Sequence, residues 1–148
     1  MGSHLATLDA IKSALAKASS VIHVKEIRDK AEAIRVYTRQ QADCREIERE
    51  ATIIRLRAER RLGELLAKSV RAGNPNCSPG GQLPAGITRK QSSNWQTIAK
   101  LPESVFEKHL ECRSPSTKRL VLLSNKHRRK QQRYGPDIGI GILTDKAT

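Results

Sequence analysis

Large apolar side chains are scarce in this sequence. Phe, Trp and Tyr together make up 3% of the 148 residues, and the hydrophobic residues as a whole make up 37%. So little apolar bulk argues against a thick globular core and favours long helices that share a narrow seam. There is also no run of 18 apolar residues, and the chain does not open on a secretory signal pattern. We therefore expect no membrane partner.

Cysteine is rare and lacks the spacing of metal or disulfide motifs. Cys44, Cys77 and Cys112 are an odd number and contain no CxxC pair, which argues against a disulfide framework and indicates a reducing compartment. His109 and Cys112 stand three residues apart, and Cys77 could fold back toward them, but a fourth zinc ligand is missing. The sequence predicts no metal site and a location in the bacterial cytoplasm or nucleoid.

Signatures of catalysis are missing too. There is no GxxxxGK[ST] loop, no HExxH pair and no nucleophile elbow. A cluster of glutamates alternates with arginines at helical spacing, where opposite charges three or four residues apart pair with each other. We expect these side chains on a solvated helix face: Glu46, Glu48, Glu50 and Glu59 among Arg45, Arg49, Arg55, Arg57, Arg60 and Arg61. The sequence thus predicts no enzyme, no cofactor and no small-molecule substrate.

Positive charge is what the sequence has in excess. Its 28 Lys and Arg residues outnumber 15 Asp and Glu residues, which gives a formal net charge of +13. Residues 1–71 hold 15 basic and 10 acidic side chains, whereas residues 72–148 hold 13 and 5. The first half is therefore mixed and the second half basic, and a polyanionic partner is favoured.

Residues 5–70 have the pattern of long helices. Leu8, Ile11 and Leu15 predict a short amphipathic helix that ends near Ser19 and Ser20. Between residues 24 and 70 there is no proline, and apolar side chains recur every three or four positions, at Val24, Ile27, Ala31, Ile34, Tyr37, Cys44, Ile47, Ala51, Ile54, Ala58, Leu62 and Leu65.

This span fits either a rod or a hairpin. Unbroken, it would reach roughly 70 Å; broken where the seam thins, at residues 38–43, it would fold back on itself. A rod cannot bury such a seam in a monomer, so we expect homodimers or higher homo-oligomers. Residues 1–4, MGSH, look like the remnant of an expression tag and take no part in the predicted function.

The rest of the chain predicts a linker, a small head and a tail. Gly, Pro and Asn dominate residues 71–86, RAGNPNCSPGGQLPAG, which indicates a mobile linker. In the head, residues 87–134, two short helices meet at Leu101 and Pro102 around Trp95 and Phe106, and a basic helix follows. The tail, residues 135–148, fits a strand, a docking segment or a disordered end.

The helix predicted after Thr88 exposes side chains that are used in DNA recognition. Arg and Lys suit guanine, Asn suits adenine, and Ser and Thr suit bases or phosphate. Thr88 itself is a candidate N-cap and phosphate ligand. The candidate base-reading residues are Arg89, Lys90, Ser93, Asn94 and Thr97.

The last predicted helix, within residues 114–134, carries basic side chains and no acidic one. Five phosphate contacts from it would give a salt dependence with a slope of roughly −4 to −5. A solubilising tail is the alternative. The candidate phosphate-binding residues are Lys118, Arg119, Lys126, Arg128, Arg129, Lys130 and Arg133.

One stretch, GITRKQSSNWQTIAKLPESVFEKHL from Gly86 to Leu110, resembles the helix-turn-helix segment of the ParB and KorB plasmid-partition family. A small turn, a Ser or Thr, an Arg, a polar recognition helix and a Leu-Pro exit occur there in the same order. The resemblance implies that Thr88 caps the recognition helix. It also implies groove-facing side chains at Arg89, Lys90 and Asn94, and core positions at Trp95, Ile98 and Leu101.

The resemblance is incomplete at two places. Ser92 stands where the family has an apolar residue, and the helix before the turn would be residues 60–70, RRLGELLAKSV, on the far side of the linker. A long charged helix before such a head also resembles uncharacterised DNA-binding proteins of phages and mobile elements.

Together these features predict an all-α fold with a long helical region (a helical hairpin or coiled-coil rod), a small helix-turn-helix head and a basic C-terminal helix. The expected function is sequence-preferring binding of double-stranded DNA, as a regulator of transcription or a DNA-organising factor of phage or mobile-element type. The alternative is a helical scaffold or adaptor whose charge is not used to read DNA. RNA binding comes third, because the few aromatic residues form no stacking platform.

Overall fold

The computed structural model describes residues 2–41, 44–71 and 83–134, and every regular element within them is a helix. The helices are α1 (Gly2–Lys17), α2 (Val21–Arg39), α3 (Arg45–Arg71), α4 (Arg89–Ala99), α5 (Glu103–Leu110) and α6 (Thr117–Tyr134). The prediction of an all-α fold is confirmed.

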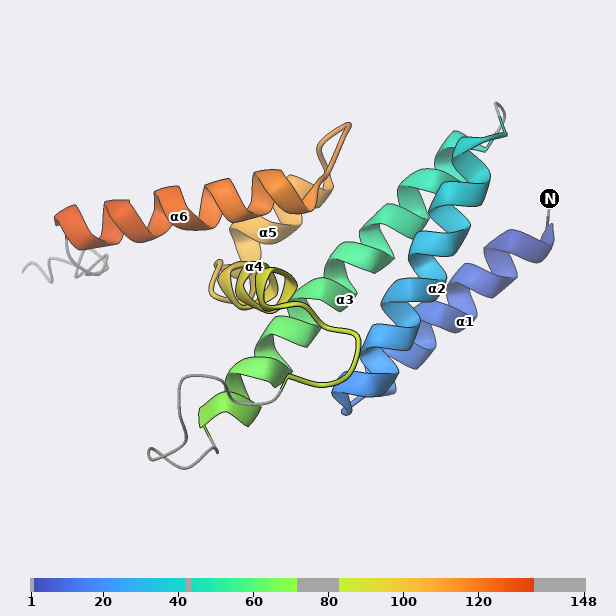
Figure 1. Cartoon of the computed structure of the whole chain (residues 1–148). Helices are drawn as coiled ribbons and strands as arrows, with labels where there is room; N and C mark the ends of the chain where they lie inside the picture. Colours follow the sequence, from blue (N-terminus) through green and yellow to red (C-terminus); the bar gives the residue numbers. More distant parts are fainter. Residues whose placement is uncertain (1, 42–43, 72–82, 135–148) are drawn as a thin grey trace, which may run out of the picture.

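Most of the predicted linker and the whole predicted tail lie outside the described residues. Figure 1 shows α1, α2 and α3 side by side, with α4, α5 and α6 on one flank.

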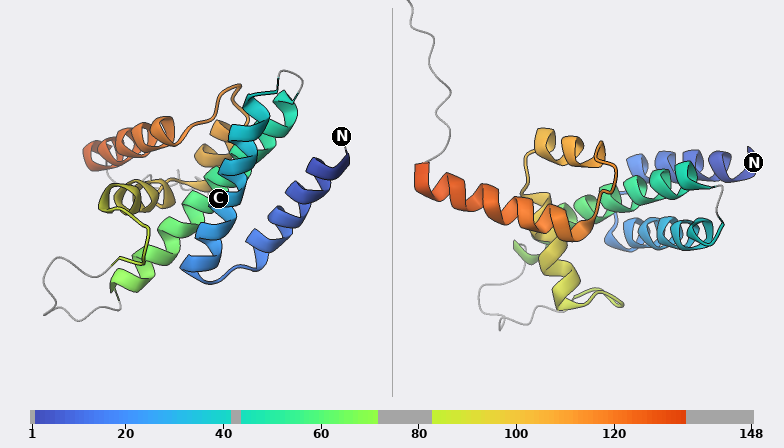
Figure 2. Two further views of the ribbon diagram at one scale, coloured as in Figure 1. Left: turned by 45° about the vertical axis from the view of Figure 1, so that its right-hand side comes forward. Right: turned by 90° about the horizontal axis from the view of Figure 1, so that it is seen from above.

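α2 and α3 form an antiparallel hairpin, which is one of the two arrangements that the sequence left open (Figure 1). α2 ends at Arg39, and the N–H groups of Gln40 and Gln41 donate to the carbonyl oxygens of Tyr37 and Thr38 at 3.2 and 3.0 Å. The chain therefore turns where the apolar seam thins. α1 runs along the hairpin in both views of Figure 2.

The hairpin buries its apolar seam inside one chain. The inference that this seam requires a second copy is therefore wrong, because α1 and α2 cover it. Its residues are at most 8% exposed and come from all three helices and from the residue just before α3: Leu8, Ile11, Ile27, Ala31, Cys44, Ile47, Ala51 and Ile54.

One predicted seam position is also wrong. Tyr37 is 51% exposed, whereas the next residue, Thr38, is 1% exposed. The Thr38 hydroxyl donates to the carbonyl oxygen of Ile34 at 2.9 Å, so its burial leaves the hydroxyl proton bonded within the helix. The smaller side chain lies inside near the hairpin turn, and the aromatic ring stays at the surface.

α4 packs directly on α3. Gly63 lies against the backbone of Trp95, and a Cβ at this position would overlap the Trp95 carbonyl group, so glycine permits the close crossing. The head that the sequence predicts as a separate unit therefore shares a core with the hairpin. The cluster around the buried Trp95 ring contains Val24, Ala58, Leu62, Leu66 and Ile87.

α5 and α6 complete the same flank around Phe106. This ring is 1% exposed, and the Arg60 guanidinium lies 4.7 Å from its centroid. α3 contributes to this cluster as well, so it is the helix that joins both parts of the fold. The other members of the cluster are Leu56, Ile98, Leu101, Leu110 and Leu120.

Glu59 is buried, although the sequence predicts it on a solvated face. Its side chain is 2% exposed, and Oε2 accepts a hydrogen bond from the Thr117 hydroxyl at 2.7 Å. Oε1 lies 3.6 Å from Nε of Arg28 and 4.0 Å from Nε of Arg55. The prediction fails because Thr117 is distant in the sequence, beyond the reach of local pairing rules. The Glu59 carboxylate lies next to Thr117, the first residue of α6, where the positive end of the helix dipole stabilises a negative charge.

A buried histidine holds the connection between α5 and α6. His109 is 6% exposed, and its Nε2 accepts the backbone N–H of Ser116 at 3.2 Å. Nε2 must therefore be unprotonated. Burial, together with the positive charge of Arg119, lowers the pKa of His109 below its ordinary value of 6.5.

We expect the free energy of unfolding to fall as the pH is lowered from about 7.5 to about 5.5. The unfolded chain takes up a proton near the ordinary histidine pKa, whereas folded His109 does so only at lower pH, so protons favour unfolding in this window. Urea unfolding at both pH values measures the change, and His109→Gln should remove most of it. His127→Gln is the control. An unchanged pH dependence in His109→Gln would contradict the assignment.

Candidate nucleic-acid interface

The turn before α4 determines where the helix begins. Gly86 has a positive φ of 80°, and the N–H of Ile87 donates to the carbonyl oxygen of Pro84 at 3.2 Å. Thr88 Oγ1 then accepts the N–H of Gln91 at 3.2 Å, and Gln91 Oε1 accepts the N–H of Thr88 at 3.0 Å. This capping box confirms Thr88 as the N-cap of α4.

The outward side of α4 carries the residues predicted to read bases. Arg89, Lys90 and Ser93 are exposed, and Asn94 and Thr97 are half-buried. The Thr97 hydroxyl donates its proton to the carbonyl oxygen of Ser93 at 2.7 Å. Toward a ligand, this hydroxyl can therefore act only as a hydrogen-bond acceptor. The predicted core positions of this segment, Trp95, Ile98 and Leu101, are buried.

Ser92 is buried where the resemblance implies an apolar residue. It is 4% exposed, and its hydroxyl oxygen accepts a hydrogen bond from Nε2 of Gln96 at 3.0 Å. A bonded hydroxyl therefore replaces the apolar contact in the first turns of α4.

α6 is anchored to α4 and then extends beyond it. The Ser124 hydroxyl donates to the carbonyl oxygen of Thr97 at 2.7 Å, and Leu120, one turn earlier, is fully buried. The C-terminal half of the helix projects away from the other helices (Figures 1 and 2). All the predicted phosphate-binding residues of α6 are exposed: Lys118, Arg119, Lys126, Arg128, Arg129, Lys130 and Arg133.

The cations of α4 and α6 lack ion-pair partners among the described residues. The ion pairs found there use lysines and arginines of α1, α2 and α3, such as Lys12 with Glu50 at 2.6 Å and Arg57 with Glu107 at 2.9 Å. Neither α4 nor α6 contains an acidic residue. α4 and α6 therefore carry positive charge that no carboxylate of their own helix offsets, on the flank opposite α1.

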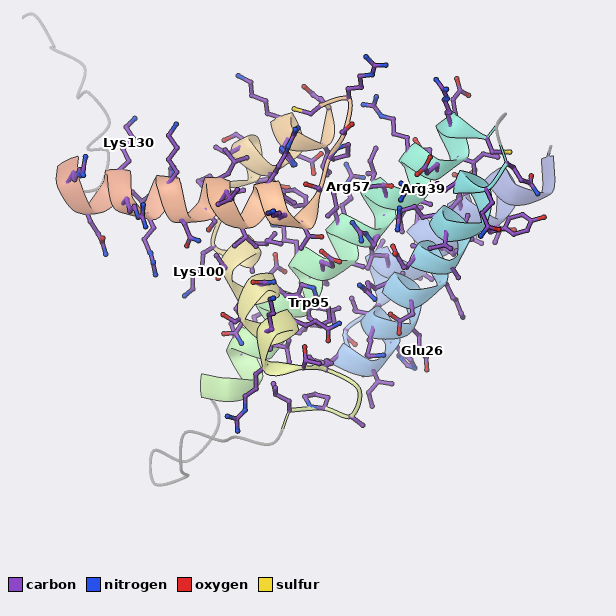
Figure 3. All side chains as sticks on the ribbon, turned by 45° about the horizontal axis from the view of Figure 1, so that its top comes forward. Glu26, Arg39, Arg57, Trp95, Lys100 and Lys130 are labelled. Carbon is purple, nitrogen blue, oxygen red and sulfur yellow. The ribbon has the colours of Figure 1, made fainter. Side chains whose placement is uncertain are left out.

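Three further residues belong to this flank but were missed by the sequence reasoning. Lys100 is exposed at the end of α4, and Figure 3 shows it, like Lys130, away from the hairpin. Leu122 is 60% exposed, and Asn125 is half-buried one turn later. Helical spacing places the last two opposite the buried side of α6, but which side is buried follows from the contact of Ser124 with α4.

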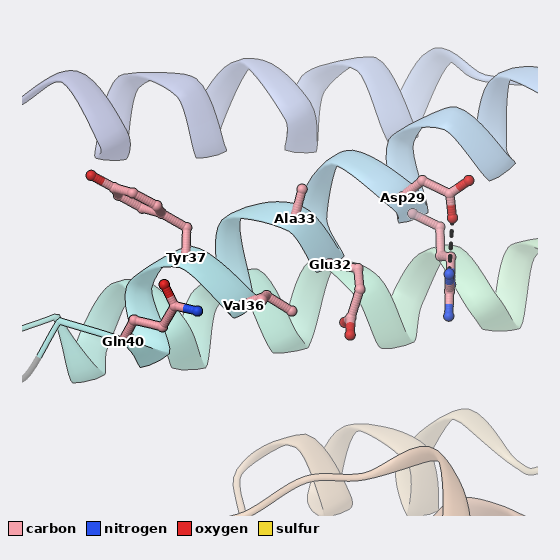
Figure 4. Close-up of a pocket in the computed structure, with 7 residues that line it drawn as sticks. Asp29, Glu32, Ala33, Val36, Tyr37 and Gln40 are labelled. Atoms are coloured by element: carbon pink, nitrogen blue, oxygen red, sulfur yellow. Dashed lines mark hydrogen bonds and ion pairs between the residues drawn. The ribbon is translucent and has the colours of Figure 1, made fainter.

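A groove of about 560 Å³ along α2 is another surface that could hold a ligand (Figure 4). Its carboxylates are neutralised: Arg28, also in the groove, donates to Asp29 at 2.9 Å, and Arg35, outside the lining, donates to Glu32 at 2.8 Å. Burial raises the pKa of Asp29, but hydrogen bonds from Lys25 and Arg28 outweigh it and lower the pKa. The hydrogen bond from Arg35 likewise lowers the pKa of Glu32. Both carboxylates are thus held ionised, as in structural ion pairs.

His109 and Cys112 are engaged in local hydrogen bonds. His109 accepts from Ser116, and the Cys112 thiol donates to the carbonyl oxygen of Lys108 at 3.7 Å. The described part of the chain holds no group of three His, Cys, Asp or Glu side chains arranged for a metal ion. Cys77 lies outside the described residues.

Comparison of the chain with protein-family models, with curated proteins and with solved structures finds no match. None of the helices in the described ranges combines the length and the apolar character needed to cross a membrane.

Proposed function

We propose that the protein binds double-stranded DNA with a sequence preference, through the exposed sides of α4 and α6. The observation that carries this proposal is the set of exposed cations on these helices, which no described carboxylate neutralises. A polyanion is the partner that such a surface favours. The protein would act as a regulator or DNA-organising factor of phage or mobile-element type, and the resemblance of residues 86–110 to the ParB and KorB family supports this role.

The two helices bring different chemistry to the duplex. The capped start of α4 presents Arg89 and Lys90, and its free backbone N–H groups suit a phosphate. Farther along α4, Asn94 has the amide that pairs with adenine. α6 supplies a longer row of cations, which suits the regular spacing of backbone phosphates.

Self-association remains part of the proposal, on a different surface. With the seam buried, a groove of about 520 Å³ between α1 and α2 is an apolar surface left for a second copy. Two copies would present two DNA-binding flanks, and the second contact would gain from effective concentration. Light scattering at micromolar protein measures the association. The groove is lined by Thr7, Ala10, Ile11, Ala14, Ile27, Lys30, Ala33 and Ile34.

A helical scaffold is the second candidate, and the same groove is the observation that favours it. A scaffold would place a helix of another protein against this apolar surface and would leave α4 and α6 without a ligand. Direct measurement of DNA binding separates the two functions.

We expect Arg89→Ala and Asn94→Ala each to cost about 1 to 3 kcal/mol on a preferred duplex and little on a scrambled one. The preferred duplex comes from a binding selection on random or genomic DNA, and fluorescence anisotropy measures both affinities. Arg39→Ala, which removes an exposed cation from the far side of the hairpin (Figure 3), is the charge-matched control.

Two results would count against this assignment in different ways. No affinity for any duplex at low salt would refute DNA binding and favour the scaffold. Equal losses on the preferred and scrambled duplexes would refute base reading by α4 and leave it a phosphate contact.

A further inference from the structure

α6 has one side that the fold does not use. Leu120 is 0% exposed and Ser124 is 6% exposed, and these two residues mark the side that packs on the rest of the chain. Helical spacing of three and four residues defines the opposite side. This outer face of α6 consists of Lys118, Leu122, Asn125, Lys126, Arg129 and Arg133.

Leu122 is out of place on a purely phosphate-binding helix. It belongs to none of the three apolar clusters, and it is 60% exposed in the middle of a cationic face. Asn125 lies beside it, and its amide has no hydrogen-bond partner among the described residues. A branched aliphatic side chain and a free amide therefore stand between Lys118 on one side and Arg129 on the other.

We propose that the outer face of α6 enters the major groove, where Leu122 contacts thymine methyl groups and Asn125 pairs with adenine. Apolar contact with the thymine methyl group and a bidentate amide pair with adenine are established means of direct base readout. The cations on either side then hold the phosphates of the two strands, which keeps the helix in register. This inference rests on the proposed function and extends base reading to a helix for which the sequence predicts phosphate contacts only.

Charge and side-chain type argue against other occupants of this face. A second copy would bring cations against cations, because α6 contains no acidic residue. A lipid surface needs a broad exposed apolar stripe, whereas the buried Leu120 faces inward. Single-stranded nucleic acid favours stacking on aromatic rings, and the outer face has none.

We expect Leu122→Ala and Asn125→Ala each to weaken binding to the preferred duplex about tenfold and to leave a scrambled duplex nearly unchanged. Fluorescence anisotropy measures both affinities. Ile22→Ala is the matched control, since Ile22 is an aliphatic residue 64% exposed on α2. Thermal unfolding of the three variants should match the wild type, because the substituted side chains are outside the core.

Replacement of thymine by uracil in the preferred duplex tests the contact itself. Removal of the thymine methyl groups should weaken wild-type binding at the contacted positions. It should cause no further loss in Leu122→Ala, because that variant has already lost the contact. 7-Deazaadenine, which lacks the N7 acceptor, is placed at one adenine at a time. At the adenine that Asn125 contacts, it should weaken wild-type binding and cause no further loss in Asn125→Ala, whereas at the adenine that Asn94 contacts it should still weaken that variant.

The outcomes separate this inference from the proposed function. If the wild type binds no duplex, DNA binding itself fails. If the wild type prefers its selected duplex but both α6 variants keep that preference, the inference is overturned and the proposed function stands. A lower molecular mass of Leu122→Ala in light scattering would assign the outer face to a second copy and would also overturn it.

Discussion

Replacing Gly63 by alanine is expected to lower the free energy of unfolding by about 2 to 3 kcal/mol, although alanine is the better helix former by about 1 kcal/mol. The added Cβ would overlap the carbonyl group of Trp95 and would lie 2.9 Å from the backbone nitrogen of Gln96. These are backbone atoms, so relief requires α4 to move off α3 and uncover the Trp95 cluster. The melting temperature should fall by roughly 5 to 10 °C, as measured by circular dichroism.

Lys68→Ala is the control for this substitution. Lys68 is exposed in the same helix, and its replacement should change the free energy of unfolding by no more than about 0.5 kcal/mol. If Gly63→Ala were as stable as the wild type, α3 and α4 could not cross in contact at this residue.

Removing three cations from α6 together is expected to weaken binding to every duplex. In the triple variant Lys126→Ala, Arg129→Ala, Arg133→Ala, the salt dependence should flatten by about 2 to 3 units, and the affinity at roughly 0.1 M salt should fall by about two orders of magnitude. Phosphates carry no base sequence, so preferred and scrambled duplexes should lose affinity together. Anisotropy titrations over a salt series measure both quantities.

A second triple variant separates the role of α6 from that of net charge. Lys17, Arg39 and Arg45 are exposed on α1, α2 and α3, and no ion pair holds them among the described residues. Their replacement by alanine removes the same charge from the opposite part of the fold. Equal losses in both triple variants would mean that total charge, rather than the α6 surface, governs affinity.

The helices of this chain follow from apolar spacing, but their arrangement does not. Residues such as Ile27 and Ile54 keep a spacing of three or four whether α2 and α3 form one rod or a hairpin. No glycine or proline marks the turn after Gln40, so the thinning seam was the only local sign of it. Tyr37 and Thr38 are adjacent, and hydrophobicity selects the wrong one because the hydroxyl bonds within its own helix.

The core of the candidate site could be predicted better than its surface. Trp95 and Ile98 stand out as apolar positions in a polar helix, and both are buried as expected. The burial of Glu59 could not be predicted from its neighbours in the sequence, because Thr117, the donor to its carboxylate, comes from a distant segment. Leu122 lies in a run of apolar residues whose register is decided only by the contact of Ser124 with α4. Non-local packing therefore determines which side of α6 faces outward.

The packing of Trp95 against α3 also determines the order in which the helices can fold. The hairpin joins neighbouring segments through a short turn, so it can form as soon as α3 has been synthesised. The apolar side chains of α3 that contact Trp95 stay partly uncovered until α4 is made, because Trp95 comes from a later segment. These side chains are Ala58, Leu62 and Leu66. A nascent chain that ends with α3 therefore exposes the part of this apolar strip that Val24 does not cover, and a chaperone can bind there or two nascent chains can pair. Docking of α4 closes that strip, and α5 and α6 then pack around Phe106.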